Sequence, residues 1–408
     1  MKILIVHNRY QQKGGEDTVV AAEEWLLRSH GHQVETLPAD NDHIQSGISS
    51  GLAAVGSIYS FSGKRKMQEA LRNHQPDLVH IHNFFPTLSP SIFAACSEAE
   101  IPVVHTLHNY RIQCARNSLY REGQVCEECV ISRSFFPGIR HACYRSSRAG
   151  SAVVGFTMAL HAQLGTWSSR ISAYIALAKF AAEKLGRFRI PPDRIFVKPN
   201  FAIDRGMGAG DGNYALFAAR LTPEKGVQTI IDADAAGAFC MDVVVLGDGP
   251  MRPALERAAA RPGSRLKMKG FVLQDEMLTW MKGAKALLMT SLWYEGGVPI
   301  VAIEAFSLGV PVIAGNIGST AETVLSEGAG MLYAPGDHME MAAALQRLAD
   351  HPEATRLMRQ RARNYYLATH TPEKNYERLM EIYAHALCVT EQADLGEADD
   401  RVVVNRPA

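Results

Sequence analysis

The chain has 408 residues, of which 47% are apolar and 21% are charged. This balance is typical of a soluble globular protein and excludes disorder as the main state of the chain. Lysine plus arginine and aspartate plus glutamate number 42 each, so the formal net charge is zero. A chain without excess positive charge is not expected to work by coating nucleic acid, and its length predicts two or three domains.

The N-terminus and the cysteine content favour a cytoplasmic protein. The apolar run at residues 3–6 is too short for a secretory signal, and no stretch of about 18 apolar residues predicts a membrane-spanning helix. Seven cysteines in a chain of this size favour a reducing compartment over a disulfide framework.

The first 200 residues alternate between predicted strands and helices. Short β-branched runs predict strands at residues 2–9, 32–37, 77–83 and 101–109, with helices at residues 18–31 and 90–98 between them. A polar, cysteine-bearing excursion at residues 114–148 interrupts this pattern, and mainly helical residues follow from 151 to 185, with a candidate strand within 171–178. We interpret residues 1–200 as one α/β domain.

The same alternation restarts after a glycine-rich join at residues 205–213. It predicts strands near residues 214–220, 242–246, 266–268, 286–289 and 312–314, and helices at 227–236, 251–260 and 299–308. Residues 201–370 therefore form a second domain, a helix at 371–388 is expected to pack back toward the first, and residues 389–408 are expected to be a polar tail. The predicted fold class is α/β, with two Rossmann-like domains facing a central ligand-binding cleft.

The turn after the strand at 214–220 carries the most specific chemical signal. Arg220 and Lys225 lie five residues apart between a predicted strand and a predicted helix. An arginine fork, a lysine ammonium and the backbone N–H groups at a helix start can converge on one anion. A diphosphate is the expected guest, and a solvated turn with Glu224 paired to a cation is the alternative.

Two glutamates form a second signal. Glu295 ends a predicted strand beside a glycine pair, and Glu304 lies in the helix that follows. Carboxylates accept paired hydrogen bonds from vicinal diols, and the helix start near Pro299 suits phosphate or sugar hydroxyls. As alternatives, Glu295 could cap the helix and Glu304 could belong to a buried ion pair.

Together these motifs resemble the retaining GT-B glycosyltransferases of family four, also called glycosyl transferases group 1. The resemblance covers the chain from Met1 to about Leu387. It is carried by Arg220 with Lys225, Glu295 and Glu304 before the stretch 305–312, Gly14-Gly15-Glu16, the strand 80–83, the segment 105–111, Gly247-Asp248-Gly249-Pro250 and the terminal helix.

The resemblance implies a role for each matching residue. Arg220 and Lys225 would hold the donor diphosphate, Glu304 would bind the ribose, and Glu295 would contact the transferred sugar. The backbone at Gly297 and Val298 would assist Glu295, Gly14 and Gly15 would let the first domain approach the donor phosphates, and His108 would lie near the transferred sugar. The reaction would need no metal or other cofactor.

One spacing departs from the family pattern. The family usually has seven residues between its two glutamates, whereas eight separate Glu295 from Glu304 here. A local bulge could absorb the extra residue, but the departure puts the role of Glu295 in question. Three further histidines, His80, His82 and His105, are expected to be core or strand-end residues.

The excursion carries a candidate metal site. Cys114, Cys126, Cys129 and Cys143 include one CxxC pair and could hold a tetrahedral structural zinc, with His141 as a substitute ligand. Unligated thiols in an acceptor loop are the alternative.

The expected partners are a UDP- or GDP-linked sugar and a glycan, lipid-linked or small-molecule acceptor, with no nucleic acid. Basic residues at 64–66 and 140–148 could place the first domain on anionic headgroups at the inner face of the membrane, or could be ordinary solvated charge. Two other functions stay open: a nucleotide-sugar epimerase on the same architecture, and a non-catalytic nucleotide-sugar binding protein.

Overall fold

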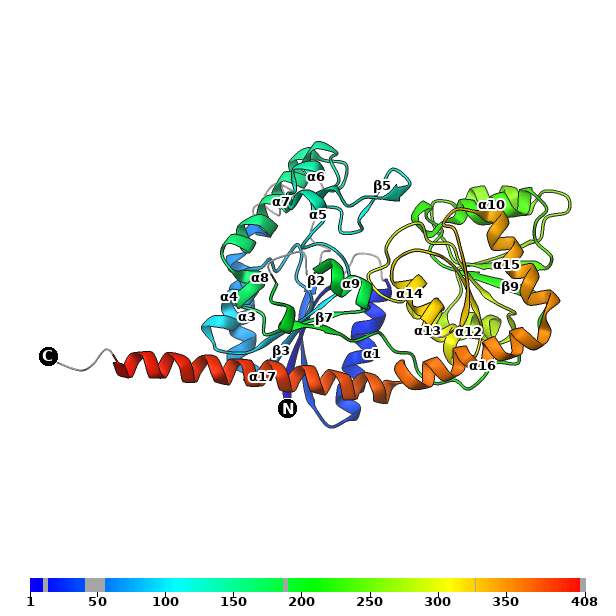
Figure 1. The fold of residues 1–408 in the computed structure, drawn as a ribbon. Coiled ribbons are helices and arrows are strands. Elements are labelled where there is room, and N and C mark those ends of the chain that lie inside the picture. Colours follow the sequence, from blue (N-terminus) through cyan, green and yellow to red (C-terminus); the bar gives the residue numbers. More distant parts are fainter. Residues whose placement is uncertain (10–13, 41–55, 186–189, 327, 404–408) are drawn as a thin grey trace. The chain divides into compact units, whose positions relative to one another are not determined.

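The structure is a computed structural model that describes residues 1–9, 14–40, 56–185, 190–326 and 328–403. The chain divides into two compact units (Figure 1). The first contains Met1–Asn117, Glu128–Lys198 and Tyr376–Ala408, and the second contains Ser118–Glu127 and Pro199–Asn375. Each unit is built around its own six-stranded sheet.

The sheet of the first unit has the strand order β2-β1-β3-β4-β7-β8, and all neighbours are parallel. The strands are β1 Lys2–Arg9, β2 Gln33–Asp40, β3 Leu78–Asn83, β4 Val103–Leu107, β7 Ala173–Ala176 and β8 Ile195–Val197. Every residue of β3, β4 and β7 is buried, as expected for a parallel sheet covered on both faces.

Helices connect these strands. They are α1 Gly15–Ser29, α3 Phe61–His74, α4 Ser91–Glu98, α7 Arg148–Gln163, α8 Thr166–Ser169 and α9 Lys179–Leu185, and a short 3-10 helix at Pro192–Arg194 precedes β8. The predicted excursion forms an antiparallel hairpin, β5 Tyr120–Arg121 with β6 Gln124–Val125, and two short helices, α5 Glu128–Ser132 and α6 Phe136–Arg140.

The last helix, α17 (Pro372–Val403), packs on the first unit. Its residues Leu379, Ile382 and Tyr383 share a buried cluster with Ile3 and Ile5 of β1. The helix differs from our prediction at its C-terminal end, because it continues to Val403 where a polar tail was expected from residue 389. Residues 389–403 contain no proline, the residue that most strongly ends a helix, so the backbone can continue the helix into this polar segment.

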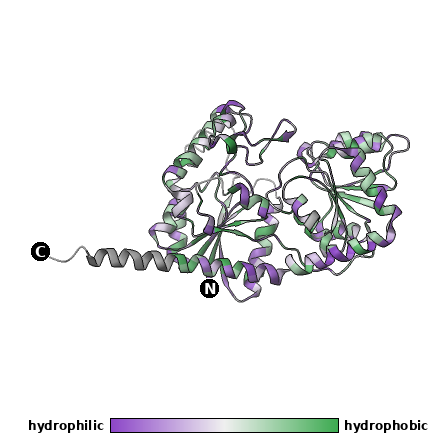
Figure 2. Cartoon of the chain, viewed as in Figure 1, coloured by the Kyte–Doolittle hydropathy of each residue, from purple (hydrophilic) through white to green (hydrophobic). Residues whose placement is uncertain are grey.

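The second unit repeats the architecture with the order β11-β10-β9-β12-β13-β14. Its strands are β9 Tyr214–Ala218, β10 Asp242–Leu246, β11 Leu266–Gly270, β12 Leu287–Met289, β13 Val312–Gly315 and β14 Gly330–Tyr333. Its helices are α10 Val227–Ala235, α11 Arg252–Ala259, α12 Gln274–Gly283, α13 Ile300–Ser307, α14 Gly318–Ser326, α15 His338–Asp350 and α16 Pro352–Thr369. Most residues of the strands in both sheets are hydrophobic (Figure 2).

In each sheet, the order of the strands along the sheet changes direction once relative to their order in the sequence. In the first unit the reversal lies between β1 and β3, and in the second it lies between β9 and β12. Open α/β sheets bind ligands at the carboxyl ends of the strands beside such a point. The fold therefore directs attention to the segments that follow these four strands. Within the described residues, no helix has the length and hydropathy needed to cross a membrane.

Candidate functional site

The segments after β9 and β12 meet in an ion pair. The Nζ atom of Lys225 lies 2.6 Å from Oε1 of Glu295, and the Ser291 hydroxyl donates to the same oxygen at 2.8 Å. Both charged side chains are largely shielded from solvent. Two of the residues predicted from sequence are therefore in direct contact at the reversal point of the second sheet.

Two hydrogen bonds to backbone carbonyl groups hold the two segments together. The Thr290 hydroxyl donates to the Lys225 carbonyl at 2.7 Å, and the Leu292 N–H donates to the Glu224 carbonyl at 2.9 Å. Gly226 makes this approach feasible, because its φ is +68° and a Cβ atom there would overlap the Thr290 carbonyl oxygen. The glycine after Lys225 is thus a requirement of the close contact between the segments.

Arg220 has a different environment. It follows β9 and is 62% exposed, with one guanidinium nitrogen 3.9 Å from Oε1 of Glu224. A pair at this distance and exposure contributes little to stability. The guanidinium is therefore available to bind an anion without breaking a strong internal contact.

Glu304 lies in α13 and is buried. Its Oε1 accepts a hydrogen bond of 2.6 Å from the side-chain amide of Gln274, the first residue of α12. Burial raises the pKa of Glu304 to about 6, although Gln274 and Arg205 partly oppose this shift. A buried carboxylate with one amide partner retains acceptor capacity for a pair of hydroxyl groups.

The segment between the two glutamates accommodates its additional residue without regular structure. Gly297 and Val298 are buried, and α13 begins at Ile300 after Pro299. The Glu295 side chain still reaches Lys225, so the longer spacing does not remove it from the other predicted residues of the second unit.

In the first unit, Gly14 and Gly15 form the start of α1, after β1. The Gly14 N–H donates to the carboxylate of Asp17 at 2.9 Å, and the other carboxylate oxygen of Asp17 contacts His7 at 2.9 Å. A Cβ atom at Gly14 or Gly15 would meet nothing within 4 Å. Among the described residues, no atom therefore crowds the two glycine positions at this helix start.

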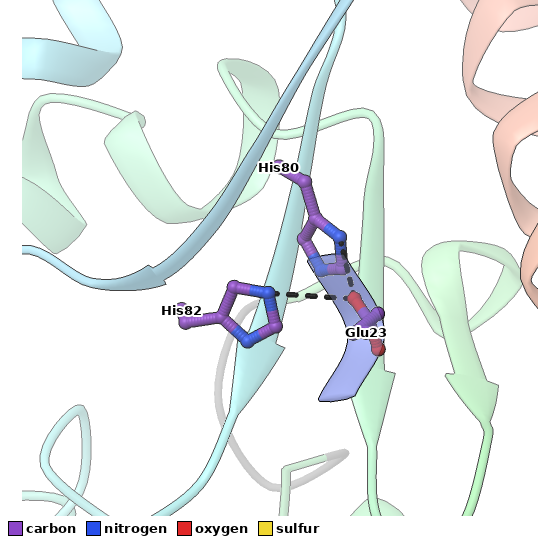
Figure 3. A group of neighbouring side chains, drawn as sticks. All are labelled: Glu23, His80 and His82. Atoms are coloured by element: carbon purple, nitrogen blue, oxygen red, sulfur yellow. Dashed lines mark ion pairs between the residues drawn. The ribbon is translucent and has the colours of Figure 1, made fainter. Parts of the chain in front are cut away.

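His108 follows β4 and is connected to a buried cluster. Its Nε2 lies 2.9 Å from Nδ1 of His82, and the two rings stack with centroids 5.2 Å apart. His80 and His82 lie two residues apart on β3, and each contacts the carboxylate of Glu23 from α1 (Figure 3). His80, His82 and His105 are all buried, as predicted for core histidines.

The Glu23, His80 and His82 group has the spacing of a metal site but not the chemistry. Lys198 places its ammonium 2.8 Å from Oε2 of Glu23 and supplies the positive charge that a metal would bring. Both ring nitrogens of His80 are engaged, by the Tyr383 hydroxyl at 2.7 Å and the Thr106 hydroxyl at 2.8 Å. We therefore assign the group to a buried ion-pair network.

Among the described residues, no three of the four candidate zinc ligands bring their sulfur atoms within 4.8 Å of one another. Cys114 and Cys129 are buried and Cys126 and Cys143 are half-buried. In the part of the chain that the structure describes, the Glu23 group is the one place where three potential ligand atoms lie within 4.8 Å of one another. Zinc at these cysteines remains a prediction that elemental analysis of purified protein can test.

Two family models match the chain, and together they cover most of it. "Glycosyltransferase Family 4" matches residues 13–202, and "Glycosyl transferases group 1" matches residues 212–351. The chain belongs to the family-four glycosyltransferases. The two matched regions correspond closely to the two sheets described above.

Curated members of family four resemble parts of the chain. The 2-deoxystreptamine glucosyltransferase of Streptomyces kanamyceticus is 31% identical over 217 residues, which are 50% of this chain and 55% of that protein. The D-inositol 3-phosphate glycosyltransferase of Streptomyces scabiei is 26% identical over 347 residues, 76% of this chain and 69% of the relative. The chain spans about half the length of the first curated relatives it matches.

Solved structures agree with the family-four assignment at the level of the fold. HepE of Anabaena in complex with UDP superposes with a TM-score of 0.64 at 17% identity, over 94% of this chain and 100% of that one. Sucrose-phosphate synthase of Thermosynechococcus elongatus has a TM-score of 0.68 at 15% identity, over 95% and 99%. These likenesses confirm the predicted GT-B architecture of two Rossmann-like domains.

Sequence reasoning missed several polar residues of this family-four chain. Glu23, Lys198 and Gln274 were not singled out, because a lone charged residue in a helix or after a strand is usually solvent-exposed. A usable signal existed for Glu23, since two histidines at alternate positions of one buried strand require a polar partner.

Proposed function

We propose that this protein is a retaining glycosyltransferase that moves a sugar from a nucleoside-diphosphate donor to a glycan, glycolipid or small-molecule acceptor. The observation that carries the proposal is the ion pair between Lys225 and Glu295 in the segments that follow β9 and β12, at the reversal point of the second sheet. The cationic Lys225 suits the diphosphate of such a donor. Two carboxylates of the same unit, the partly exposed Glu295 and the buried Glu304, suit its hydroxyl groups.

The charges support specific roles. Arg220 and Lys225 bind the diphosphate and offset the charge on the departing nucleotide. Glu295 contacts hydroxyls of the transferred sugar, with the backbone of Gly297 and Val298. Glu304 accepts hydrogen bonds from the ribose diol, a role supported by its burial and its single amide partner. Gly14 and Gly15 give the phosphates room.

A UDP-linked sugar is the proposed donor. HepE has been solved with UDP and with UDP-glucose, and its fold matches this chain over nearly the whole length. The relatives act on acceptors as different as 2-deoxystreptamine and inositol 3-phosphate, according to their names, so the acceptor of this chain is left as a class.

Calorimetric titration with UDP tests the donor site. Replacing Arg220 or Lys225 by alanine should cost about 1.5–3 kcal/mol of UDP binding, because a charged contact is lost, which lowers affinity by roughly 10- to 150-fold. The control is Arg356→Ala, which removes an arginine that is 75% exposed on α16 and pairs with Glu353. Unchanged affinity in both Arg220 and Lys225 variants would overturn the diphosphate assignment.

Turnover separates this proposal from the two alternatives. With an acceptor, the product should carry the anomeric configuration of the donor, which NMR of the product reports. Conversion of the nucleotide sugar into an epimer without any acceptor would instead identify an epimerase, and binding without turnover across a panel of acceptors would favour a sensor.

We also propose that the first unit contacts anionic membrane headgroups. Neighbouring helices expose the apolar side chains Ile131, Phe136 and Phe156 and the basic residues Arg133 and Arg140. Two other candidates for that role, Lys64 and Arg65, are instead paired with Glu98 and Glu69. Co-sedimentation with vesicles that contain anionic lipid, lost on replacing Ile131 and Phe136 by serine, tests this contact.

A further inference from the structure

A path of buried polar side chains runs from α1 to His108. The carboxylate of Glu23 approaches Nε2 of His82 at 3.4 Å, and Nδ1 of His82 approaches Nε2 of His108 at 2.9 Å. Glu23 and His82 are almost completely buried. Among the described residues, the Nε2 atom of His82 has no hydrogen-bond partner, so its ion-pair contact with the Glu23 carboxylate is the polar contact that orients it.

Glu23 is ionised in this environment. Burial alone would raise its pKa, but Lys198 at 2.8 Å and His80 outweigh burial and hold the pKa of Glu23 well below its usual value. The carboxylate is therefore an acceptor and cannot donate.

An ionised carboxylate determines the protonation pattern along the path. The proton of His82 is stabilised on Nε2, which faces the negative charge, and this leaves Nδ1 of His82 as an acceptor. His108 must then donate from Nε2 to close the 2.9 Å contact, because two bare nitrogens would repel. The second nitrogen of His108, Nδ1, is left with its lone pair.

Both imidazoles stay neutral at physiological pH. Burial, together with the neighbouring His80, lowers the pKa of His82 to about 3. Burial and the neighbouring His82 likewise lower the pKa of His108 well below its usual value. The rings of His82 and His108 are therefore uncharged, and the contacts between them fix the position of their protons rather than a charge.

We propose that Glu23 and His82 are positioning residues that fix His108 in one neutral tautomer, in which Nδ1 presents a lone pair to a hydroxyl group of the transferred sugar. The inference rests on the proposed function, which assigns His108 to that sugar. A neutral acceptor suits a hydroxyl donor and offers nothing to a carboxylate, so the path selects neutral sugars over uronic acids at this position.

The tautomer can be measured without turnover. Long-range 1H–15N correlation spectra of the full-length protein distinguish a protonated from an unprotonated ring nitrogen. We expect Nε2 of His108 to carry the proton in the wild type. Two variants break the path: Glu23→Gln combined with Lys198→Met, which removes both buried charges together, and His82→Phe, which keeps a stacked ring. In both we expect a mixture of His108 tautomers.

The matched control is Tyr383→Phe. It removes one buried hydroxyl from the same cluster, 2.7 Å from His80, without lying on the path to His108. This variant should keep the wild-type tautomer. A proton on Nδ1 of His108 in the wild type, or a wild-type tautomer in both path variants, would overturn the inference.

Binding measurements connect the tautomer to the sugar. The two path variants should bind UDP-glucose more weakly in proportion to the fraction of His108 that loses the wild-type tautomer, about twofold for an even mixture, while UDP affinity is unchanged. Equal loss for UDP and UDP-glucose would contradict a contact with the sugar. A wild type that shows the expected tautomer but binds neither ligand would leave the path intact and overturn the proposed function instead.

Discussion

The buried ion pair between Lys198 and Glu23 gives the most informative stability prediction. Both side chains are about 1% exposed, and their charged atoms lie 2.8 Å apart. At this distance, and with an effective dielectric constant of about 20, the attraction is about 6 kcal/mol. Much of it offsets the cost of removing the two charges from water.

The single and double replacements should therefore behave very differently. Lys198→Met leaves the Glu23 carboxylate buried without its closest cation and should lower the free energy of unfolding of the first unit by about 3–5 kcal/mol. Glu23→Gln should cost a similar amount because it strands the ammonium. The double variant should lie within about 1–2 kcal/mol of wild type, since neither charge remains.

Hydrogen exchange of the β1 and β3 amides is the appropriate assay, because it reports opening of the first unit separately from the second. Urea unfolding at neutral pH gives the total. Single variants within about 1 kcal/mol of wild type, or a double variant whose loss equals the sum of the two single losses, would refute the reasoning that this pair is strongly coupled.

Three further predictions concern other positions. Gly226→Ala should lower the free energy of unfolding of the second unit by at least about 2 kcal/mol, because it combines a left-handed φ with overlap at Thr290. The control is Gly237→Ala, which has a similar φ of +64° but nothing within 4 Å. It should cost about 1 kcal/mol in urea unfolding. His370 has its pKa lowered to about 4 by burial, against the bond to the Asn200 carbonyl. The contribution of neutral His370 to stability is complete above pH 6.5 and falls by about 3 kcal/mol as the pH drops toward 4. His370→Gln should therefore make the free energy of unfolding less dependent on pH in that range. An unchanged dependence on pH would contradict this assignment. UDP affinity should rise as the pH increases through about 6, where Glu304 ionises, and titrations of Glu304→Gln should lose that dependence.

The sequence was most predictive where local pattern and chemistry coincide. The apolar runs predicted the strands of both sheets except β8 and β14, because parallel strands are apolar on both faces. Arg220, Lys225 and Glu295 could be grouped because each follows a strand at the same sheet edge. The amphipathic helix α15 was missed although its apolar spacing was readable.

Other features depend on contacts that no local pattern carries. Glu23 and Lys198 are 175 residues apart, and neither has neighbours that indicate burial. The Gln274 amide that occupies Glu304 comes from a different helix. The length of α17 was also underestimated, because polarity was taken as a sign of irregular structure although residues 389–403 contain no proline to end the helix.

The contact between Lys225 and Glu295 has a consequence for ligand exchange. In the proposed donor site the lysine already has an internal counterion, so an incoming diphosphate would share the ammonium with a carboxylate that repels it. A donor that still carries its sugar can compensate, because its hydroxyls give Glu295 new hydrogen-bond partners. The spent nucleotide has no such groups and experiences the repulsion without relief. One carboxylate would then favour the entry of intact donor and the departure of product.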